Sequence, residues 1–88
     1  MTRDEIWAVI KKHLGDAVDD LDVESIDTSR SMRDYGANSL DLVEVVSRSM
    51  RELKVKIPRA ELNKLADIDG LIDLFKKSLD AGGSGPAT

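Results

Sequence analysis

The sequence predicts an all-α fold: a four-helix bundle with a long first loop and a short third helix. Three segments repeat apolar residues at the spacings of three and four that an amphipathic helix requires, and no two segments alternate as paired strands do. The 88 residues, 41% of them hydrophobic, are enough for one folded domain. We expect residues 1–80 to form this domain and residues 81–88, "AGGSGPAT", to form a flexible tail.

The first helix is expected over residues 2–18. Thr2 followed by Glu5 has the spacing of a capping box, in which each side chain accepts a hydrogen bond from the other residue's backbone amide. The apolar residues that follow recur at helical spacing and define the face that should be buried. They are Ile6, Val9, Ile10, His13 or Leu14, and Ala17.

Residues 18–35 have no helical period, and we interpret them as a long loop that is ordered rather than floppy. Isolated apolar residues stand among acids and hydroxyls, and they should pin the loop to the core. These are Val18, Leu21, Val23, Ile26 and Met32. One short helical turn is expected from Ser31 to Asp34.

The second helix is predicted from about Ser39 to Lys54 because its apolar residues again recur at spacings of three and four. The expected buried stripe comprises Leu40, Val43, Val46, Met50 and Leu53, widened by Leu42 and Val45. The helix should end before Pro58, since a residue that precedes proline is pushed towards extended geometry.

Two further helices complete the predicted bundle. Residues 58–65 fit a short third helix, with Pro58 at or just before its first position. Residues 67–80 fit a fourth helix, which Asp67 or Asp69 can cap. Its expected apolar stripe comprises Ile68, Leu71, Ile72, Phe75 and Leu79.

The composition excludes several classes of function. The chain has no cysteine, so it has no disulfide framework, thiol nucleophile or cysteine metal site, and it suits a reducing cytoplasm. Aromatic residues are only 3% and the net charge is −4, which argues against binding to nucleic acid. No apolar run approaches the roughly 18 residues of a membrane span. We therefore expect a cytoplasmic protein, monomeric because no long apolar stripe is left over.

The sequence also lacks the residues of an independent catalytic site. His13 is the only histidine, so no second one completes a metal site, and it is most simply a partly packed helix residue. Nothing near His13 suggests a serine–histidine pair, and no glycine-rich phosphate loop is present. We expect neither an enzyme nor a metal site.

The stretch "GANSLDLVEVV", residues 36–46, places Asn38 and Ser39 side by side at the start of the second helix. Asn38 can cap the helix, which leaves the Ser39 hydroxyl free. With Leu40 and Val43 on the buried stripe, Ser39 should face solvent. A phosphodiester there would be favoured by the free amides and dipole of the helix N-terminus. Two interpretations remain open: Ser39 is only a cap, or its hydroxyl is modified.

This stretch, followed by "LKVKIP", resembles the acyl and peptidyl carrier proteins. The matching residues are Gly36, Asn38, Ser39, Leu40, Asp41, Val43, Glu44, Val46, Ile57 and Pro58. The resemblance covers roughly residues 3–80, including the helix order and the long first loop. It implies that a phosphopantetheinyl transferase attaches 4′-phosphopantetheine covalently to Ser39. The thiol of this arm would carry acyl groups as thioesters to partner enzymes, so the reactive sulfur is imported.

The resemblance further implies that partner enzymes recognise residues beside Ser39 and along the second helix. We assign this role to Asn38, Leu40, Asp41, Glu44, Arg48 and Arg51. The family usually has Asp where this chain has Asn38, so a charge that the transferase can read is missing and loading is expected to be selective. Residues 39–60 contain three acids and five bases, whereas fatty-acid carriers are acidic here. This face is either a solvated mixture of charges or a surface for a different set of partners.

Residues 38–62 are most similar to stand-alone carriers of polyketide pathways, in particular the donor carriers of β-branching cassettes. Those carriers present acetyl groups to an HMG-CoA-synthase-like enzyme. The implied partners are an acyltransferase and a ketosynthase-like or HMG-CoA-synthase-like enzyme. Two alternatives remain: a peptidyl or aminoacyl carrier of a non-ribosomal pathway, and a helical interaction module without an arm, in which Ser39 is a cap or a phosphorylation site.

A set of apolar residues on the second and fourth helices and between them has two interpretations. They either line a cleft that shelters a short acyl chain or pack as ordinary core. The set comprises Val43, Val46, Met50, Leu65, Ile68 and Leu71.

Overall fold

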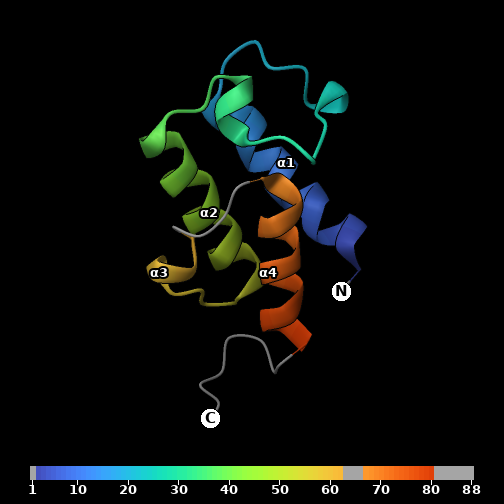
Figure 1. Ribbon diagram of the computed structural model, residues 1–88, viewed down its shortest axis with the longest axis vertical. Coiled ribbons are helices and arrows are strands. Elements are labelled where there is room, and N and C mark those ends of the chain that lie inside the picture. The colour runs from blue at the N-terminus through green and yellow to red at the C-terminus, as the bar shows by residue number, and fades with distance from the viewer. Residues whose placement is uncertain (1, 63–66, 81–88) are drawn as a thin grey trace.

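Four α-helices, one of them short, and two 3-10 turns make up the part of the chain that this computed structural model describes, residues 2–62 and 67–80 (Figure 1). The elements are α1 (Arg3–Ala17), η1 (Val23–Ser25), η2 (Met32–Tyr35), α2 (Ser39–Leu53), α3 (Arg59–Leu62) and α4 (Ile68–Asp80). The predicted all-α fold, its helix order and its long first loop are confirmed. None of the described helices is long and apolar enough to cross a membrane.

The first helix begins with the predicted capping box. The Glu5 amide donates to Thr2 Oγ1 at 3.2 Å, and the Thr2 amide donates to Glu5 Oε1 at 2.9 Å. The buried face of α1 consists of Ile6, Ile10 and Leu14. This face packs against both α2 and α4, so α1 provides the support on which α2 is held.

The connection between α1 and α2 is ordered, as predicted, and it contains two turns instead of one. The unpredicted turn η1 is capped by Asp22, whose carboxylate accepts hydrogen bonds from the Glu24 amide at 3.2 Å and the Ser25 hydroxyl at 2.7 Å. The expected turn near Ser31 is η2. The connection is tied to the start of α4 by backbone bonds, because the amides of residues 68 and 69 donate to the carbonyls of residues 30 and 28.

The buried face of α2 differs from the predicted stripe. Val45, Val46, Ser49 and Leu53 are buried, whereas Leu40 is 79% exposed and Val43 is 48% exposed. At 100° per residue, the centre of the observed face is displaced by roughly 80° from the centre of the predicted five-residue stripe. The periodicity counts only apolar residues, so it misses Ser49, which is small enough to lie in the contact with the core and is fully buried. Leu40 and Val43 are consequently left on the outer side of the helix.

The segment after α2 turns sharply and packs inward. Lys54 has a left-handed backbone with φ of 56°, and the Val55 amide donates to the Met50 carbonyl at 3.0 Å. Val55 and Ile57 are buried, so this extended segment forms part of the core between α2 and α3. The second helix thus ends at Leu53, one residue before the predicted end.

The two C-terminal helices follow the predicted order. The Glu61 amide donates to the Pro58 carbonyl at 3.0 Å, so Pro58 precedes α3 as expected. The predicted third helix extends into residues 63–65, which lie outside the described part of the chain, as does the predicted tail 81–88. Of the two candidate caps of α4, Asp67 accepts from the Gly70 amide at 2.7 Å. The buried residues of α4 are Ile68, Leu71, Ile72 and Phe75.

A charged contact joins α1 to α2 on the surface. The Glu52 carboxylate accepts from Lys12 Nζ at 2.8 and 3.0 Å, and Glu52 Oε1 lies 2.9 Å from His13 Nε2. The hydrogen bond from Lys12, and then the one to His13, lower the pKa of Glu52 below its ordinary value of 4.5. His13 is thus a half-buried helix residue whose ring contacts the Glu52 carboxylate, which confirms the prediction of a partly packed residue.

This contact predicts a pH-dependent contribution to stability. Because folding lowers the pKa of Glu52, the contact stabilises the folded state above the ordinary carboxyl pKa of 4.5 and is lost as the pH falls through the lower folded value. We expect Glu52→Gln to melt below the wild type at neutral pH, and the difference to shrink as the pH falls below 4.5. Thermal unfolding across this range measures it. A difference that stays constant with pH would contradict the assignment.

Candidate functional site

The site begins at the turn that leads into α2. Gly36 ends η2 with φ of 94°, a left-handed conformation that favours glycine, and its amide donates to the Arg33 carbonyl at 3.1 Å. The next residue, Ala37, is buried, and Asn38 occupies the N-cap position of α2. Gly36 therefore sets the direction from which the chain enters α2.

Asn38 caps α2, as predicted. The Asp41 amide donates to Asn38 Oδ1 at 2.9 Å, and the Asn38 amide donates to Asp41 Oδ2 at 3.1 Å, which completes a capping box. The side-chain oxygens of Asn38 and Asp41 thereby accept hydrogen bonds from backbone amides at the start of the helix. The hydroxyl of the next residue is not needed for capping.

Ser39 is the first residue of α2, and it is exposed. Its hydroxyl accepts a hydrogen bond from Arg33 Nη2 at 3.3 Å, across the turn that Gly36 ends. The prediction that Ser39 faces solvent is confirmed, although the burial of Leu40 and Val43 from which it was argued is wrong. Arg33 is a member of the site that sequence reasoning missed, because its approach depends on the path of the turn. Its only signal was a basic residue in a predominantly acidic loop.

The residues assigned to partner recognition fall into three groups along α2. Leu40 stands next to Ser39 as an exposed apolar side chain, and Asp41 lies in the cap. One turn further on, Glu44 and Arg48 form an ion pair with 2.6 Å between Oε2 and Nη2. Arg51 is exposed near the far end of the helix and is not gathered with Ser39.

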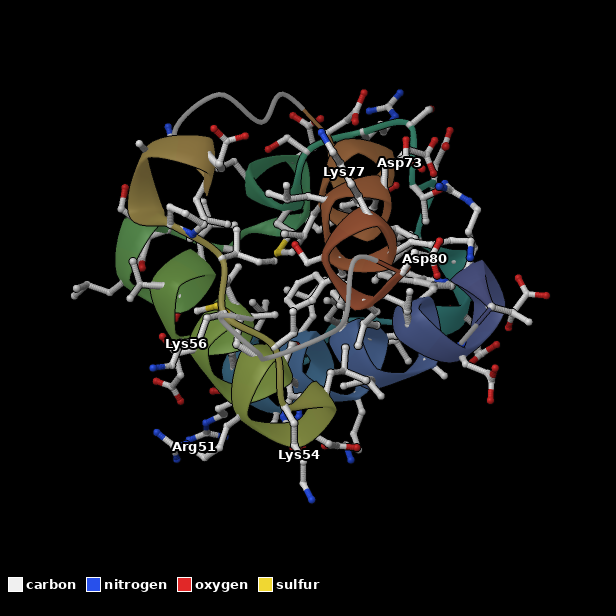
Figure 2. All side chains as sticks on the ribbon, turned by 90° about the horizontal axis from the view of Figure 1, so that it is seen from below. Arg51, Lys54, Lys56, Asp73, Lys77 and Asp80 are labelled. Atoms are coloured by element: carbon white, nitrogen blue, oxygen red, sulfur yellow. The ribbon has the colours of Figure 1, made fainter. Side chains whose placement is uncertain are left out.

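The far end of α2 carries its own cluster of positive charge. Figure 2 shows Arg51, Lys54 and Lys56 pointing outward from the last turn of α2 and the segment after it. All three side chains are exposed. Positive charge thus gathers at the end opposite the serine, whereas Asp41 and Glu44 lie near the serine.

A cavity of about 730 Å³ opens beside Ser39. Its walls include five of the six residues predicted to form a cleft, namely Val43, Val46, Met50, Ile68 and Leu71. The sixth, Leu65, lies outside the described residues. Three of these five residues are also buried in the core, namely Val46, Ile68 and Leu71. Each of the three therefore packs in the core and lines the cavity.

The cavity combines polar and apolar walls. Ser39, Arg33 and Ser31 contribute polar groups, and Ser47 and Asp67 add others on α2 and before α4. The Asp67 carboxylate is already engaged by the Gly70 amide. An attachment point beside a partly apolar hollow is suited to a flexible group with a polar tether and an apolar end.

The exposed hydroxyl also suits a phosphate ester. It lies at a helix N-terminus, whose amides and dipole favour an anion, and a guanidinium stands 3.3 Å away. Together with the helical bundle and the adjacent cavity, these are the features of a carrier protein, which holds a tethered group for other enzymes.

Comparison with known proteins identifies the family. The family model described as "Phosphopantetheine attachment site" matches residues 8–75. The chain therefore belongs to the acyl carrier protein family, whose cofactor is 4′-phosphopantetheine bound covalently to a serine. Members of this family are carriers rather than catalysts. A phosphopantetheinyl transferase loads them, and acyl-handling enzymes act on what they carry.

Relatives in bacteria agree with this assignment. The chain is 36% identical over 77 residues to the acyl carrier protein of Campylobacter fetus, and the aligned region covers 84% of this chain and 95% of the relative. It is 27% identical over 78 residues to that of Thermotoga maritima, covering 89% and 96%. It is 26% identical over 75 residues to "Polyketide biosynthesis acyl-carrier-protein AcpK" of Bacillus subtilis, covering 85% and 92%. No solved structure is significantly similar to the chain.

Proposed function

We propose that Ser39 is the serine that receives the arm. The observation that carries this proposal is its exposed hydroxyl at the start of α2, outside the cap and next to the cavity. The other serines in the matched range are bonded to neighbouring groups, fully buried, or placed within the body of a helix. They are Ser25, Ser29, Ser31, Ser47 and Ser49.

Loading at Ser39 is a phosphoryl-type transfer from coenzyme A. A bond forms between Ser39 Oγ and the phosphorus that bears the pantetheine, the pyrophosphate bond of coenzyme A breaks, adenosine 3′,5′-bisphosphate leaves, and the serine proton passes to the transferase. The attached arm supplies the thiol that bears acyl groups as thioesters. This chain contributes a rigid helix start, through the Asn38–Asp41 box, which presents the hydroxyl to the transferase.

We propose that the cavity shelters a short acyl chain on the arm. Val43, Val46 and Met50 line it from α2, and Ile68 and Leu71 line it from α4. Met50 is the most adaptable of these side chains because it is unbranched. Its sulfur accepts from the Ile57 amide at 3.3 Å, so one side of this wall is fixed by the segment after α2.

The proposed pathway is polyketide synthesis, with an acetyl group passed to an HMG-CoA-synthase-like enzyme. Three observations support it: the similarity of residues 38–62 to donor carriers, the similarity of the chain to the polyketide carrier of Bacillus subtilis, and the basic residues on α2. Arg48 is paired with Glu44, so the cations available to a partner are Arg51, Lys54 and Lys56. The proposed contact surface runs from Leu40 to these cations.

Transfer of an acetyl group tests the pathway. The protein is loaded with acetyl-phosphopantetheine and mixed with an HMG-CoA-synthase-like enzyme or with a fatty-acid ketosynthase, and acetylation of each enzyme is followed by mass. We expect faster acetylation of the first enzyme and weaker binding, by roughly tenfold, after Leu40→Ala. Val9→Ala, an apolar truncation on α1 outside the cavity and outside the proposed contact surface, serves as the control. Preferential transfer to the ketosynthase would contradict the polyketide pathway and leave the carrier function intact.

A further inference from the structure

Arg33 stands beside the attachment hydroxyl without a carboxylate partner in the part of the chain that the structure describes. Its guanidinium donates to Ser39 Oγ at 3.3 Å. By contrast, the guanidiniums of Arg3 and Arg48 are paired with acids. Within the described residues, the positive charge of Arg33 is thus not neutralised by an ion pair, in a chain of net charge −4.

The acids nearest in sequence to this pair are committed elsewhere. Asp34 Oδ2 accepts from the Ser31 amide at 3.2 Å, in the capping box of η2. Asp41 Oδ2 accepts from the Asn38 amide at 3.1 Å. Each carboxylate completes a capping box, so it is bonded to a nearby backbone amide. Arg33 therefore remains directed at Ser39.

The turn that bears Arg33 is itself fixed. Ser31 Oγ accepts from the Arg33 amide at 3.1 Å, and the Gly36 amide donates to the Arg33 carbonyl at 3.1 Å. Met32, the neighbouring residue, is buried in the core. The backbone from which the guanidinium extends is therefore anchored on both sides, so the approach of Arg33 to Ser39 is built into the fold.

Loading changes what lies in front of this guanidinium. The Ser39 oxygen becomes part of a phosphodiester, whose two non-bridging oxygens share one negative charge close to the original hydroxyl position. Arginine presents a planar fork of donors that matches phosphate oxygens, and such charge-assisted bonds are stronger than neutral ones. The weak contact seen with the hydroxyl would be replaced by one or two contacts with an anion.

We propose that Arg33 is a positioning residue that binds the phosphodiester of the loaded arm and fixes its first link at the rim of the cavity. This inference rests on the proposed attachment at Ser39. Arg33 itself lines the cavity together with Ser39 and Met32, so an arm held by its phosphate starts its path at that opening. The amides at the start of α2 add favourable charge from the other side.

A thermodynamic cycle tests the proposal. Unloaded and fully loaded forms of the wild type and of Arg33→Gln are prepared, with loading verified by intact mass, and their unfolding equilibria are compared. We expect loading to stabilise the wild type relative to Arg33→Gln by roughly three- to tenfold in the unfolding constant, the range for a partly exposed charged contact. High salt should reduce this coupling. The phosphorus NMR signal of the loaded wild type should also shift in the variant.

Two controls make the cycle specific. Arg30→Gln removes an exposed cation from the same loop without touching the hydroxyl contact, so it should leave the coupling intact. Arg33→Lys keeps the charge and loses the fork, so it should retain part of the coupling. Equal stabilisation by loading in the wild type and Arg33→Gln, with an unchanged phosphorus signal, would overturn the role of Arg33 alone. Failure of all variants to accept the arm at Ser39 would overturn the proposed attachment and this inference with it.

Discussion

Ser39→Ala is expected to fold as the wild type does and to accept no phosphopantetheine at all. The loss is complete because no other atom can take the place of the nucleophilic oxygen. The fold should be retained because Asn38 performs the capping and Ser39 is exposed, with one hydrogen bond to Arg33. Alanine is also the best helix former, so the free energy of unfolding should change by no more than about 0.5 kcal/mol.

The measurement pairs intact mass after loading with thermal unfolding of the same sample. Ser47→Ala is the matched control, since Ser47 lines the same cavity two turns along α2 and should leave loading unchanged. Collapse of the fold in Ser39→Ala would show that the serine is a structural cap. Undiminished loading in that variant would place the arm on a different residue.

Phe75→Ala is expected to remove about 3–5 kcal/mol from the free energy of unfolding. The Phe75 side chain on α4 is completely buried, and it is the largest of the fully buried side chains. Truncation removes its apolar contacts and leaves a hollow in a core with no disulfide to support it. A domain of this size has a total stability of about 4–13 kcal/mol, so the loss should be a large fraction of the total.

Urea denaturation followed by circular dichroism measures this loss. Phe75→Leu keeps most of the volume and should cost clearly less than the alanine variant. Leu79→Ala, on the same helix but only half-buried, provides a second comparison and should also cost less. A loss below about 1 kcal/mol for Phe75→Ala would contradict the packing described for α4.

Local chemistry made much of the fold predictable. The capping box at Thr2, the cap at Asn38 and the start of α3 by Pro58 follow from short-range rules, and the structure has all three. The orientation of α2 was less predictable, because it is set by its packing against α1. Leu40 and Val43 fit an apolar period as well as the observed residues do, and only the three-dimensional packing places Ser49 inside and Leu40 outside.

The same division holds for the site. Ser39 could be singled out because a second capping residue beside Asn38 has no structural purpose. Five of the cleft residues were predictable because core and cavity share the apolar walls of α2 and α4. Arg33 could not be found from the sequence, since it approaches Ser39 only through the turn ended by Gly36.

Two apolar residues of α2 that were expected to be buried are instead exposed close to Ser39. Leu40 is 79% exposed beside the proposed attachment point, and Val43 is 48% exposed on the rim of the cavity. Their exposure leaves an apolar surface close to Ser39. Exposed apolar groups surrounded by polar ones are typical of interaction sites. The prediction of partner recognition by Leu40 remains a proposal, which Leu40→Ala tests.

The most direct test of the proposed attachment is the mass of the wild-type chain after incubation with coenzyme A and a broad-specificity phosphopantetheinyl transferase. Trypsin then releases residues 34–48, in which Ser39 and Ser47 can be told apart by fragmentation. We predict a gain of one 4′-phosphopantetheine unit, located on Ser39. A folded protein that gains nothing, both as the wild type and as Asn38→Asp, or that gains the unit on another serine, would contradict it.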